Sequence, residues 1–196
     1  MSQRHGTHGE AQRRALIRAA FDIIAQKGFE GLRTREVASR GNVNIATLHY
    51  YFPSKEDLIR GVAAFLTEEF ERNGRLGPPA NTALERVQRE FVEIVETANT
   101  DPSTYIVMIE LSNRAHRDPS VRQVVQEIQK NWQAFLESVL ERGVAAGEFP
   151  PDLNVKVTAW TLRTLLLGTV NQILLNGESV AAADIFESIG RLVGVK

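Results

Sequence analysis

The 196-residue sequence contains no cysteine, which excludes disulfide bonds, thiol catalysis and metal sites with cysteine ligands. It also lacks a run of about 18 apolar residues, the length that a membrane-spanning helix needs. The most apolar region, residues 155–175, is interrupted by polar residues such as Lys156 and Arg163. The opening MSQRHGTHGE has no apolar stretch of the kind found in a secretory signal. We therefore predict a soluble, cytoplasmic protein that has no membrane partner and begins with a flexible arm at residues 1–9.

Groupings of residues that carry enzyme chemistry are also missing. The four histidines, at positions 5, 8, 49 and 116, are scattered, and His5 and His8 fall in the expected flexible arm. The sequence shows no phosphate-binding loop, no paired carboxylates and no nucleophile with a matching base and acid. We expect a protein that is not an enzyme and that holds neither a cofactor nor a metal.

Charge is unevenly distributed along the chain, although the net charge is only -1. Residues 1–60 carry ten basic and six acidic residues, a net charge of +4, whereas the remainder carries 13 and 18, a net charge of -5. This asymmetry favours contact between one end of the chain and a polyanion. The alternative is chance unevenness on a solvated surface.

Hydrophobic spacing predicts an all-α fold of about nine helices, and no segment shows the alternation of a strand. Start and stop signals, including Gly28 and the pair Ser54 and Asp57, help to bound the helices. The helices are expected at about 10–27, 34–40, 45–51, 54–72, 82–98, 103–116, 119–146, 153–176 and 181–193. The clearest break is NGRLGPPAN, residues 73–81.

The segment TREVASRGNVNIATLHYY matches the plan of two short helices joined by a tight turn, a helix-turn-helix. Such a turn needs a residue that tolerates positive φ, and Gly41 and Asn42 are the two residue types best suited to it. Asn44 stands where an N-cap belongs. The second helix of such a motif lies in the major groove of DNA.

Four rings follow one another at His49, Tyr50, Tyr51 and Phe52, on barely two helical turns. At about 100° per residue, only one or two of them can face a core. Helical spacing turns Leu48 and Phe52 inward, together with Val37, Ala38 and Val43. The remaining outward side chains then face DNA; the alternative is that Tyr50 and Tyr51 pack against the first helix.

The segment that contains these rings resembles the TetR family of bacterial transcription regulators. The stretch NIATLHYYFPSKEDL is similar to that family's S-x-x-T-L-Y-x-x-F-x-S-K-E-x-L, with matches at Thr47, Leu48, Phe52, Ser54, Lys55, Glu56 and Leu58. The segments EVA at 36–38 and AQKGFEGLRT also resemble it. Three positions depart from the pattern: His49 replaces the usual tyrosine, Asn42 the usual turn glycine and Arg33 a capping threonine, which leaves Thr34 as the expected cap.

The resemblance implies three parts: a helix-turn-helix DNA-binding domain at 10–53, a connecting helix at 54–72, and an effector-binding and dimerisation domain at 80–196. It places phosphate contacts at Thr34, Arg35 and Lys55, whereas His49 can meet either a phosphate or a base. The DNA-contacting residues expected are Thr34, Arg35, Asn44, Ile45, Ala46, Thr47, His49, Tyr50, Tyr51 and Lys55. One copy makes few contacts, so we expect a homodimer on a near-palindromic operator of double-stranded DNA.

The apolar residues of the helix expected at 153–176 cover an arc that is too wide to face the core of its own chain alone. One line of apolar residues suits that core, and a second line, about 100° further round the helix, suits a partner. We expect a dimer interface at Trp160, Leu167, Leu174, Ile185 and Ile189. Full burial within a single chain is the alternative.

In the resembled family, the second domain encloses a pocket for a small organic effector. The residues expected to line such a pocket are Phe65, Tyr105, Met108, Asn113, Trp132, Phe135 and Asn171. Aromatic and methionine side chains at helical spacing also suit an ordinary core. We expect a repressor that the effector releases from its operator. The alternatives are an activator, a regulator controlled by a protein partner, or a helical enzyme or carrier with a DNA-binding head.

Overall fold

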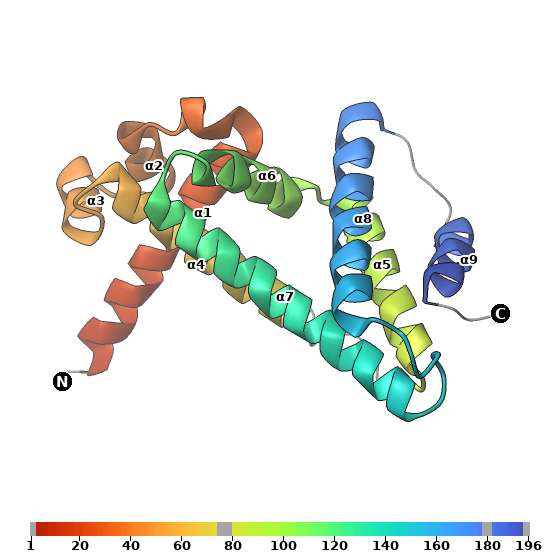
Figure 1. Cartoon of the computed structure of the whole chain (residues 1–196). Coiled ribbons are helices and arrows are strands. Elements are labelled where there is room, and N and C mark those ends of the chain that lie inside the picture. The colour runs from red at the N-terminus through yellow and green to blue at the C-terminus, as the bar shows by residue number, and fades with distance from the viewer. Residues whose placement is uncertain (1–2, 74–79, 178–181, 194–196) are drawn as a thin grey trace. The chain divides into compact units, whose positions relative to one another are not determined.

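The computed structural model describes residues 3–73, 80–177 and 182–193, and these residues form helices and no strand (Figure 1). The prediction of an all-α fold is confirmed. The described helices are α1 (Gln3–Gly31), α2 (Thr34–Arg40), α3 (Ile45–Tyr51), α4 (Lys55–Asn73), α5 (Ala83–Thr100), α6 (Ser103–Ala115), α7 (Pro119–Ala145), α8 (Val155–Asn176) and α9 (Ala182–Leu192). Most of the predicted break at 73–81 lies outside the described residues.

The first helix differs from its predicted bounds at both ends. It begins at Gln3, where a flexible arm was expected over residues 1–9. At the other end, Gly28 adopts φ 64° and ψ -175°, and a short helical turn then continues to Gly31. The left-handed backbone of Gly28 explains why helical geometry is interrupted there, as the sequence predicted.

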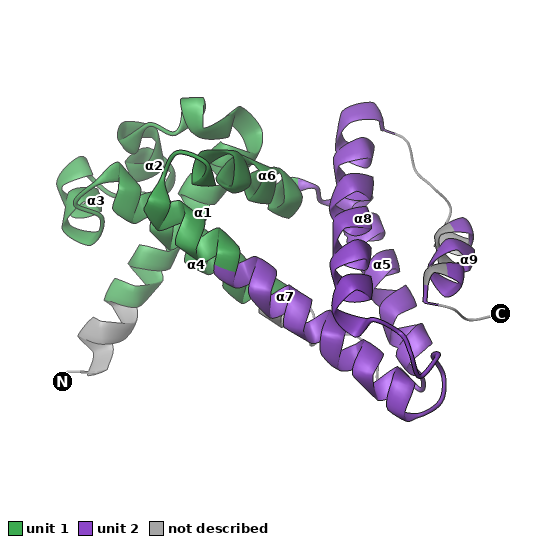
Figure 2. Ribbon diagram, viewed as in Figure 1, with its two compact units in different colours: residues 1–72, 103–126 green, residues 73–102, 127–196 purple. Residues whose placement is uncertain are grey.

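The chain divides into two compact units, which Figure 2 shows in different colours. Unit 1 contains residues 1–72 and 103–126, and unit 2 contains residues 73–102 and 127–196. This division differs from the domains expected from sequence, because α6 and the start of α7 belong to unit 1. The helix-turn-helix segment therefore shares its compact unit with a segment that follows it by about fifty residues.

Unit 1 has a core built from one face of each helix. α1 packs against both α2 and α6, and α2 packs against α3. Fully buried side chains include Ile24, Leu48, Phe52, Leu66 and Leu111. The predicted inward positions Leu48 and Phe52 are confirmed, and they hold α3 against the rest of the unit.

Unit 2 buries a separate cluster in which α5 packs against α8 and α9. The buried face of α8 is the stripe predicted to serve the core of its own chain. This cluster contains Ala83, Val87, Phe91, Leu136, Val139, Leu140, Phe149, Ala159, Leu162, Leu166, Ile189 and Val193. Glu148, in the loop between α7 and α8, accepts hydrogen bonds from the backbone N–H groups of Ala83 (2.8 Å) and Leu84 (3.3 Å) at the start of α5.

Candidate nucleic-acid interface

The turn between α2 and α3 uses its two central residues for different purposes. Asn42 adopts φ 53°, the left-handed conformation that the turn requires, whereas Gly41 has an ordinary φ of -77°. Gly41 is needed for space instead, because a Cβ there would lie 2.6 Å from Cδ2 of Leu16 in α1. The backbone N–H of Val43 closes the turn on the carbonyl of Ala38 at 2.9 Å.

Helix α3 starts at the cap predicted from sequence. The Asn44 side chain accepts a hydrogen bond from the backbone N–H of Thr47 at 2.8 Å and another from the Thr47 hydroxyl at 3.1 Å. These bonds satisfy a backbone donor that would otherwise lack a partner. They also fix the direction in which α3 leaves the turn, and therefore the face that it exposes.

The outer face of α3 is open to solvent. Tyr50 is 81% exposed and Ile45 is 39% exposed, and the side chains of Ala46 and His49 are exposed as well. Because these side chains are exposed, the unit loses the apolar contact area that their burial would give. It is unusual for a tyrosine and an isoleucine on one short helix both to be exposed. A binding surface explains that exposure.

Tyr51 behaves differently from Tyr50. It is half-buried, and a Cβ at Gly9 of α1 would lie 3.4 Å from its hydroxyl oxygen. Its ring meets that of Tyr50 edge to face, with centroids 5.2 Å apart. This placement agrees with the alternative that Tyr51 packs against the first helix, from where it supports the exposed Tyr50 ring.

The start of α2 brings a correction. The N-cap position is Arg33, whose side chain makes no capping hydrogen bond, and Thr34 is the first helical residue. Thr34 therefore does not cap α2, contrary to expectation, because it lies one residue too late. It remains half-buried beside the exposed Arg35 at the N-terminal end of the helix.

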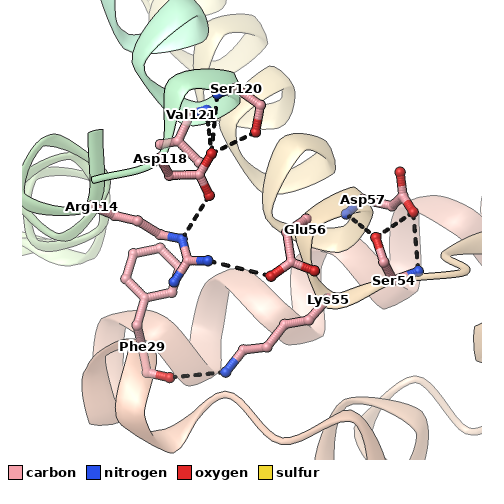
Figure 3. A network of polar contacts seen from close by, with 9 residues as sticks. All are labelled: Phe29, Ser54, Lys55, Glu56, Asp57, Arg114, Asp118, Ser120 and Val121. Atoms are coloured by element: carbon pink, nitrogen blue, oxygen red, sulfur yellow. Dashed lines mark hydrogen bonds and ion pairs between the residues drawn. The ribbon is translucent and has the colours of Figure 1, made fainter. Parts of the chain in front are cut away.

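Helix α4 begins with a complete capping box. The backbone N–H of Ser54 donates to the Asp57 carboxylate at 3.0 Å, and the backbone N–H of Asp57 donates to the Ser54 hydroxyl oxygen at 3.0 Å. The hydrogen bond from the Ser54 hydroxyl, followed by that from Arg60, lowers the pKa of Asp57. Lys55, the first residue of α4, is half-buried, and its Nζ lies 3.5 Å from the carbonyl oxygen of Phe29 (Figure 3).

One ion pair links the C-terminal part of α1 with α2, and a second lies within α2. Glu36 accepts hydrogen bonds from Lys27 at 2.8 Å and from Arg40 at 2.9 Å. The hydrogen bond from Lys27 is the main cause that lowers the pKa of Glu36. Exposed pairs of this kind add little stability, and only the Lys27–Glu36 pair joins α2 to α1.

The seven predicted pocket residues do not gather in one unit. Phe65, Tyr105, Met108 and Asn113 belong to unit 1, and Trp132, Phe135 and Asn171 belong to unit 2. Phe65 and Met108 are buried, as the alternative of an ordinary core predicts, and Phe65 meets Phe21 edge to face at 5.5 Å. Asn113 is exposed and lines a cavity of about 380 Å³ with Phe29, Glu110 and Arg114.

Trp132 and Phe135 lie beside a charged pair that the sequence analysis missed. Trp132 Nε1 donates to Glu90 Oε1 at 3.2 Å, and Arg86 pairs with Glu90 at 3.0 Å. The Arg86 guanidinium also lies over the Phe135 ring, 4.7 Å from its centroid. Burial raises the pKa of Glu90 despite the nearby Arg86. The Arg86–Glu90 pair is local, but the contacts of Trp132 and Phe135 with it join residues more than forty positions apart, so no local pattern could reveal the whole cluster.

Helix α8 exposes an apolar face. Among the described residues, every exposed large hydrophobic side chain lies on α3 or α8: Ile45, Tyr50, Val157, Trp160, Leu165, Leu167 and Leu175. The predicted interface residues Trp160 and Leu167 are exposed, and Leu174 is half-buried. Asn171 is exposed on the same helix, so we reassign it from the pocket to the surface of α8.

Two other predicted interface residues lie in α9. Ile189 is only 1% exposed and packs in the core of unit 2, so it is unavailable to a second chain and is corrected from interface to core. The side chain of Ile185 lies outside the described residues.

Neither a metal centre nor a membrane span emerges from the described residues. They contain no group of His, Cys, Asp or Glu arranged to hold a metal ion. In the same part of the chain, the helices are too short or too polar to cross a bilayer.

The turn, the capped α3 and its exposed face define a helix-turn-helix DNA-binding transcription regulator. Residues 16–62 match the family described as "Bacterial regulatory proteins, tetR family", and residues 83–193 match "BetI-type transcriptional repressor, C-terminal". The chain belongs to the TetR family of bacterial regulatory proteins. The family consists of transcription regulators and not of enzymes.

Curated relatives are similar over different shares of the chain. The HTH-type transcriptional repressor KstR of Rhodococcus jostii is 34% identical over 93 residues, which span 46% of this chain and 42% of that protein. The fatty acid metabolism regulator protein of Bacillus subtilis is 25% identical over 159 residues, which span 80% of this chain and 78% of the relative.

Solved structures share the fold at lower identity. A TetR transcription regulator from Haloarcula marismortui has a TM-score of 0.83 at 16% identity, covering 94% of this chain and 97% of its own. A transcriptional regulator from Saccharomonospora viridis in complex with choline has a TM-score of 0.81 at 21% identity, covering 94% and 96%.

Proposed function

We propose that this regulator acts as a homodimeric repressor that binds a near-palindromic operator and releases it when a small organic effector binds. The observation that carries the proposal is the exposed outer face of α3, with Tyr50 81% exposed on a capped recognition helix. Two copies of α3, about 34–36 Å apart, would enter successive major grooves on one side of the duplex. The repressor names of the BetI-type family and of KstR support the direction of regulation.

Within each copy, the DNA contacts fall into two kinds. Ile45, Ala46, Thr47 and Tyr50 would meet base edges, where an apolar side chain can touch a thymine methyl group. Lys55, Thr34 and Arg35 would meet phosphates from the starts of α4 and α2. His49 is exposed on α3 and carries both a ring and a hydrogen-bond donor, so it suits either kind.

The apolar face of α8 supports the dimer. Trp160 is 56% exposed, and Val157 and Leu175 are 56% and 71% exposed on the same helix. Several exposed apolar side chains on one helix are typical of a surface that meets a partner, and a homodimer uses the same face twice. The interface would centre on α8 and not on the buried Ile189 of α9.

The Glu90 cluster in unit 2 favours an organic cation as the effector. A carboxylate beside aromatic rings recognises cations, and Arg86 already occupies such a place against Glu90 and Phe135. An organic cation would replace Arg86 there. In support, related solved structures hold choline in one case and proflavin in another, although the Bacillus subtilis FadR structure holds stearoyl-CoA.

Thermal shifts with choline, proflavin and stearoyl-CoA test the effector class. We expect an organic cation to raise the melting temperature of the wild type and to raise it less in the Glu90→Gln variant, which loses the carboxylate charge. Equal shifts in the two proteins, or a shift with stearoyl-CoA alone, would refute the cation site.

The phosphate role of Lys55 is tested by salt dependence. Lys55→Ala should weaken binding to every duplex sequence and lower the slope of log K against log salt by about one per contact. The matched control is Lys130→Ala, which removes an exposed lysine from α7 in unit 2. Fluorescence anisotropy with labelled duplexes measures both. A slope equal to the wild type would remove Lys55 from the interface.

A further inference from the structure

Phe29, which follows the kink at Gly28, is held by side chains of α6 and α4 at once. Its backbone N–H donates to Glu110 Oε2 at 3.1 Å, and its carbonyl oxygen lies 3.5 Å from Lys55 Nζ. The Arg114 guanidinium lies over the Phe29 ring at 5.4 Å from the centroid. All four residues belong to unit 1. Lys55 and α6 therefore meet at one residue of α1.

The kink makes this arrangement possible. Gly28 has φ 64°, which turns the next peptide out of the helical path. The Phe29 N–H thus becomes available to a side chain, and the Glu110 carboxylate lies beside it, 3.4 Å from where a Gly28 Cβ would stand. A side chain from a helix distant in sequence here replaces the hydrogen bond that α1 itself does not provide.

Arg114 extends the contact to the start of α4. It lies one helical turn after Glu110 on the same face of α6. Its guanidinium reaches Glu56 at 3.5 Å and Asp118 at 3.3 Å (Figure 3). Asp118 in turn accepts the backbone N–H groups of Ser120 (3.1 Å) and Val121 (3.3 Å) at the start of α7. Glu56 directly follows Lys55 in sequence, and Phe29 contacts the Lys55 side chain. Arg114 therefore contacts two residues that are adjacent to the lysine.

We propose that Glu110 and Arg114 of α6 are positioning residues for the phosphate contact of Lys55, and that they act through Phe29. Glu110 fixes the Phe29 peptide, whose carbonyl oxygen orients the Lys55 ammonium before DNA arrives. An ammonium has three N–H donors, so one long contact to a carbonyl leaves it able to bind a phosphate. Orientation in advance reduces the rotamer freedom that a lysine loses on binding.

This inference rests on the proposed function, because it assumes that Lys55 contacts DNA. It adds one acidic and one basic residue of α6, Glu110 and Arg114, which are not among the DNA-contacting residues predicted from sequence. Neither needs to touch DNA itself. Their effect should therefore disappear when Lys55 is absent, which distinguishes positioning from an independent contact.

The test is a double-mutant cycle on duplex binding. Wild type, Lys55→Ala, Glu110→Ala and the double variant are compared by anisotropy over a salt series. We expect Glu110→Ala to weaken binding about two- to tenfold, as for the loss of one hydrogen bond. It should also flatten the salt slope, and it should add little in the Lys55→Ala background. Glu110→Gln, which keeps an oxygen acceptor for the Phe29 N–H, should restore most of the affinity.

A merely structural role would change the melting temperature without changing the salt slope. If Glu110→Ala loses its helical signal, Arg114→Gln replaces it in the cycle, with the same expected coupling to Lys55→Ala. Losses that multiply fully in the double variant, or a salt slope equal to that of the wild type, would overturn the proposal. Absence of duplex binding by the wild type would instead overturn the proposed function, and a Lys55→Ala loss without an α6 effect would overturn the positioning alone.

Discussion

Tyr50 and Tyr51 show how one residue step on a helix separates recognition from support. Tyr50 leaves most of its ring in solvent, whereas Tyr51 leans towards α1 and meets the Tyr50 ring edge to face. A step of 100° carries the two rings to different surroundings. The exposed ring is therefore available to DNA, and its neighbour limits the directions in which it can point.

Replacing Tyr50 should separate affinity from stability. Tyr50→Ala should weaken binding to a preferred duplex by about 1–3 kcal/mol, the range for a base-reading side chain. Because the Tyr50 ring is largely exposed, the melting temperature of the variant should stay close to that of the wild type. Gln123→Ala, at an exposed position on α7 in the same unit, is the control. Unchanged affinity in Tyr50→Ala would contradict the assignment of α3 as the recognition helix.

Glu90 is half-buried, and its surroundings shift its protonation equilibrium. Burial raises its pKa, and Glu93 acts in the same direction, while Arg86 opposes them. The folded state thus binds its proton more tightly than the unfolded state. The free energy of unfolding should consequently fall as pH rises from about 4, where an unfolded glutamate titrates, through the higher folded pKa.

Chemical denaturation at several pH values measures this effect. The free energy of unfolding of the wild type, taken relative to Glu90→Gln, should decrease between about pH 4 and neutral pH. The variant cannot ionise at this position, and its amide still offers an acceptor to Trp132. Two curves that stay parallel over the range would show that Glu90 titrates alike in the folded and unfolded states.

At the scale of elements, the turn between α2 and α3 determines how the recognition helix is presented. Asn42 supplies the left-handed backbone and Gly41 the close approach to Leu16. A larger side chain is disfavoured by the positive φ at position 42 and by the contact with Leu16 at position 41. The sequence offered both residues for positive φ, and only the structure shows which one adopts it.

Asn42 should tolerate glycine better than alanine. Asn42→Ala should destabilise the protein by about 1 kcal/mol, because an L-residue with a Cβ and no local hydrogen bond disfavours φ near 53°. Asn42→Gly is the matched control and should unfold at nearly the wild-type denaturant concentration. A larger loss in the glycine variant would mean that the Asn42 side chain, and not its backbone, stabilises the turn.

Local signals explain why most helix bounds could be predicted. Asn44, Ser54 and Asp57 act within three residues of their partners, so their capping roles are visible in sequence. The Glu110–Phe29 hydrogen bond joins positions 81 residues apart, and no spacing rule could indicate it. The same limit explains why α6 was expected in the second domain and why the Glu90 cluster was missed.

At the scale of the whole molecule, two exposed apolar surfaces stand out among the described residues, on α3 and on α8. Each unit carries one of them. The sequence predicted both, although it placed part of the second on Ile189, which the core of unit 2 encloses. A helical wheel shows which side chains of one helix share an apolar face. It does not show whether that face packs against the chain's own core or stays exposed.

Introducing a charged residue on α8 tests whether its exposed apolar face forms the dimer interface. Leu167→Glu should convert dimers into monomers in sedimentation velocity, because a carboxylate buried without a partner costs about 2–5 kcal/mol per copy. Ala134→Glu, at an exposed position on α7, controls for the added charge. Duplex affinity should fall with the dimer. A Leu167→Glu variant that remains dimeric at the same concentration would place the interface elsewhere.

The central claim is that α3 reads DNA in two symmetric copies. Selection of bound duplexes from a random double-stranded pool by the purified wild-type protein tests it most directly. We predict enrichment of an inverted repeat whose half-site centres lie about 10–10.5 base pairs apart, or a multiple of that distance. A pool without an enriched sequence, or one enriched only in a single unrepeated site, would contradict the account.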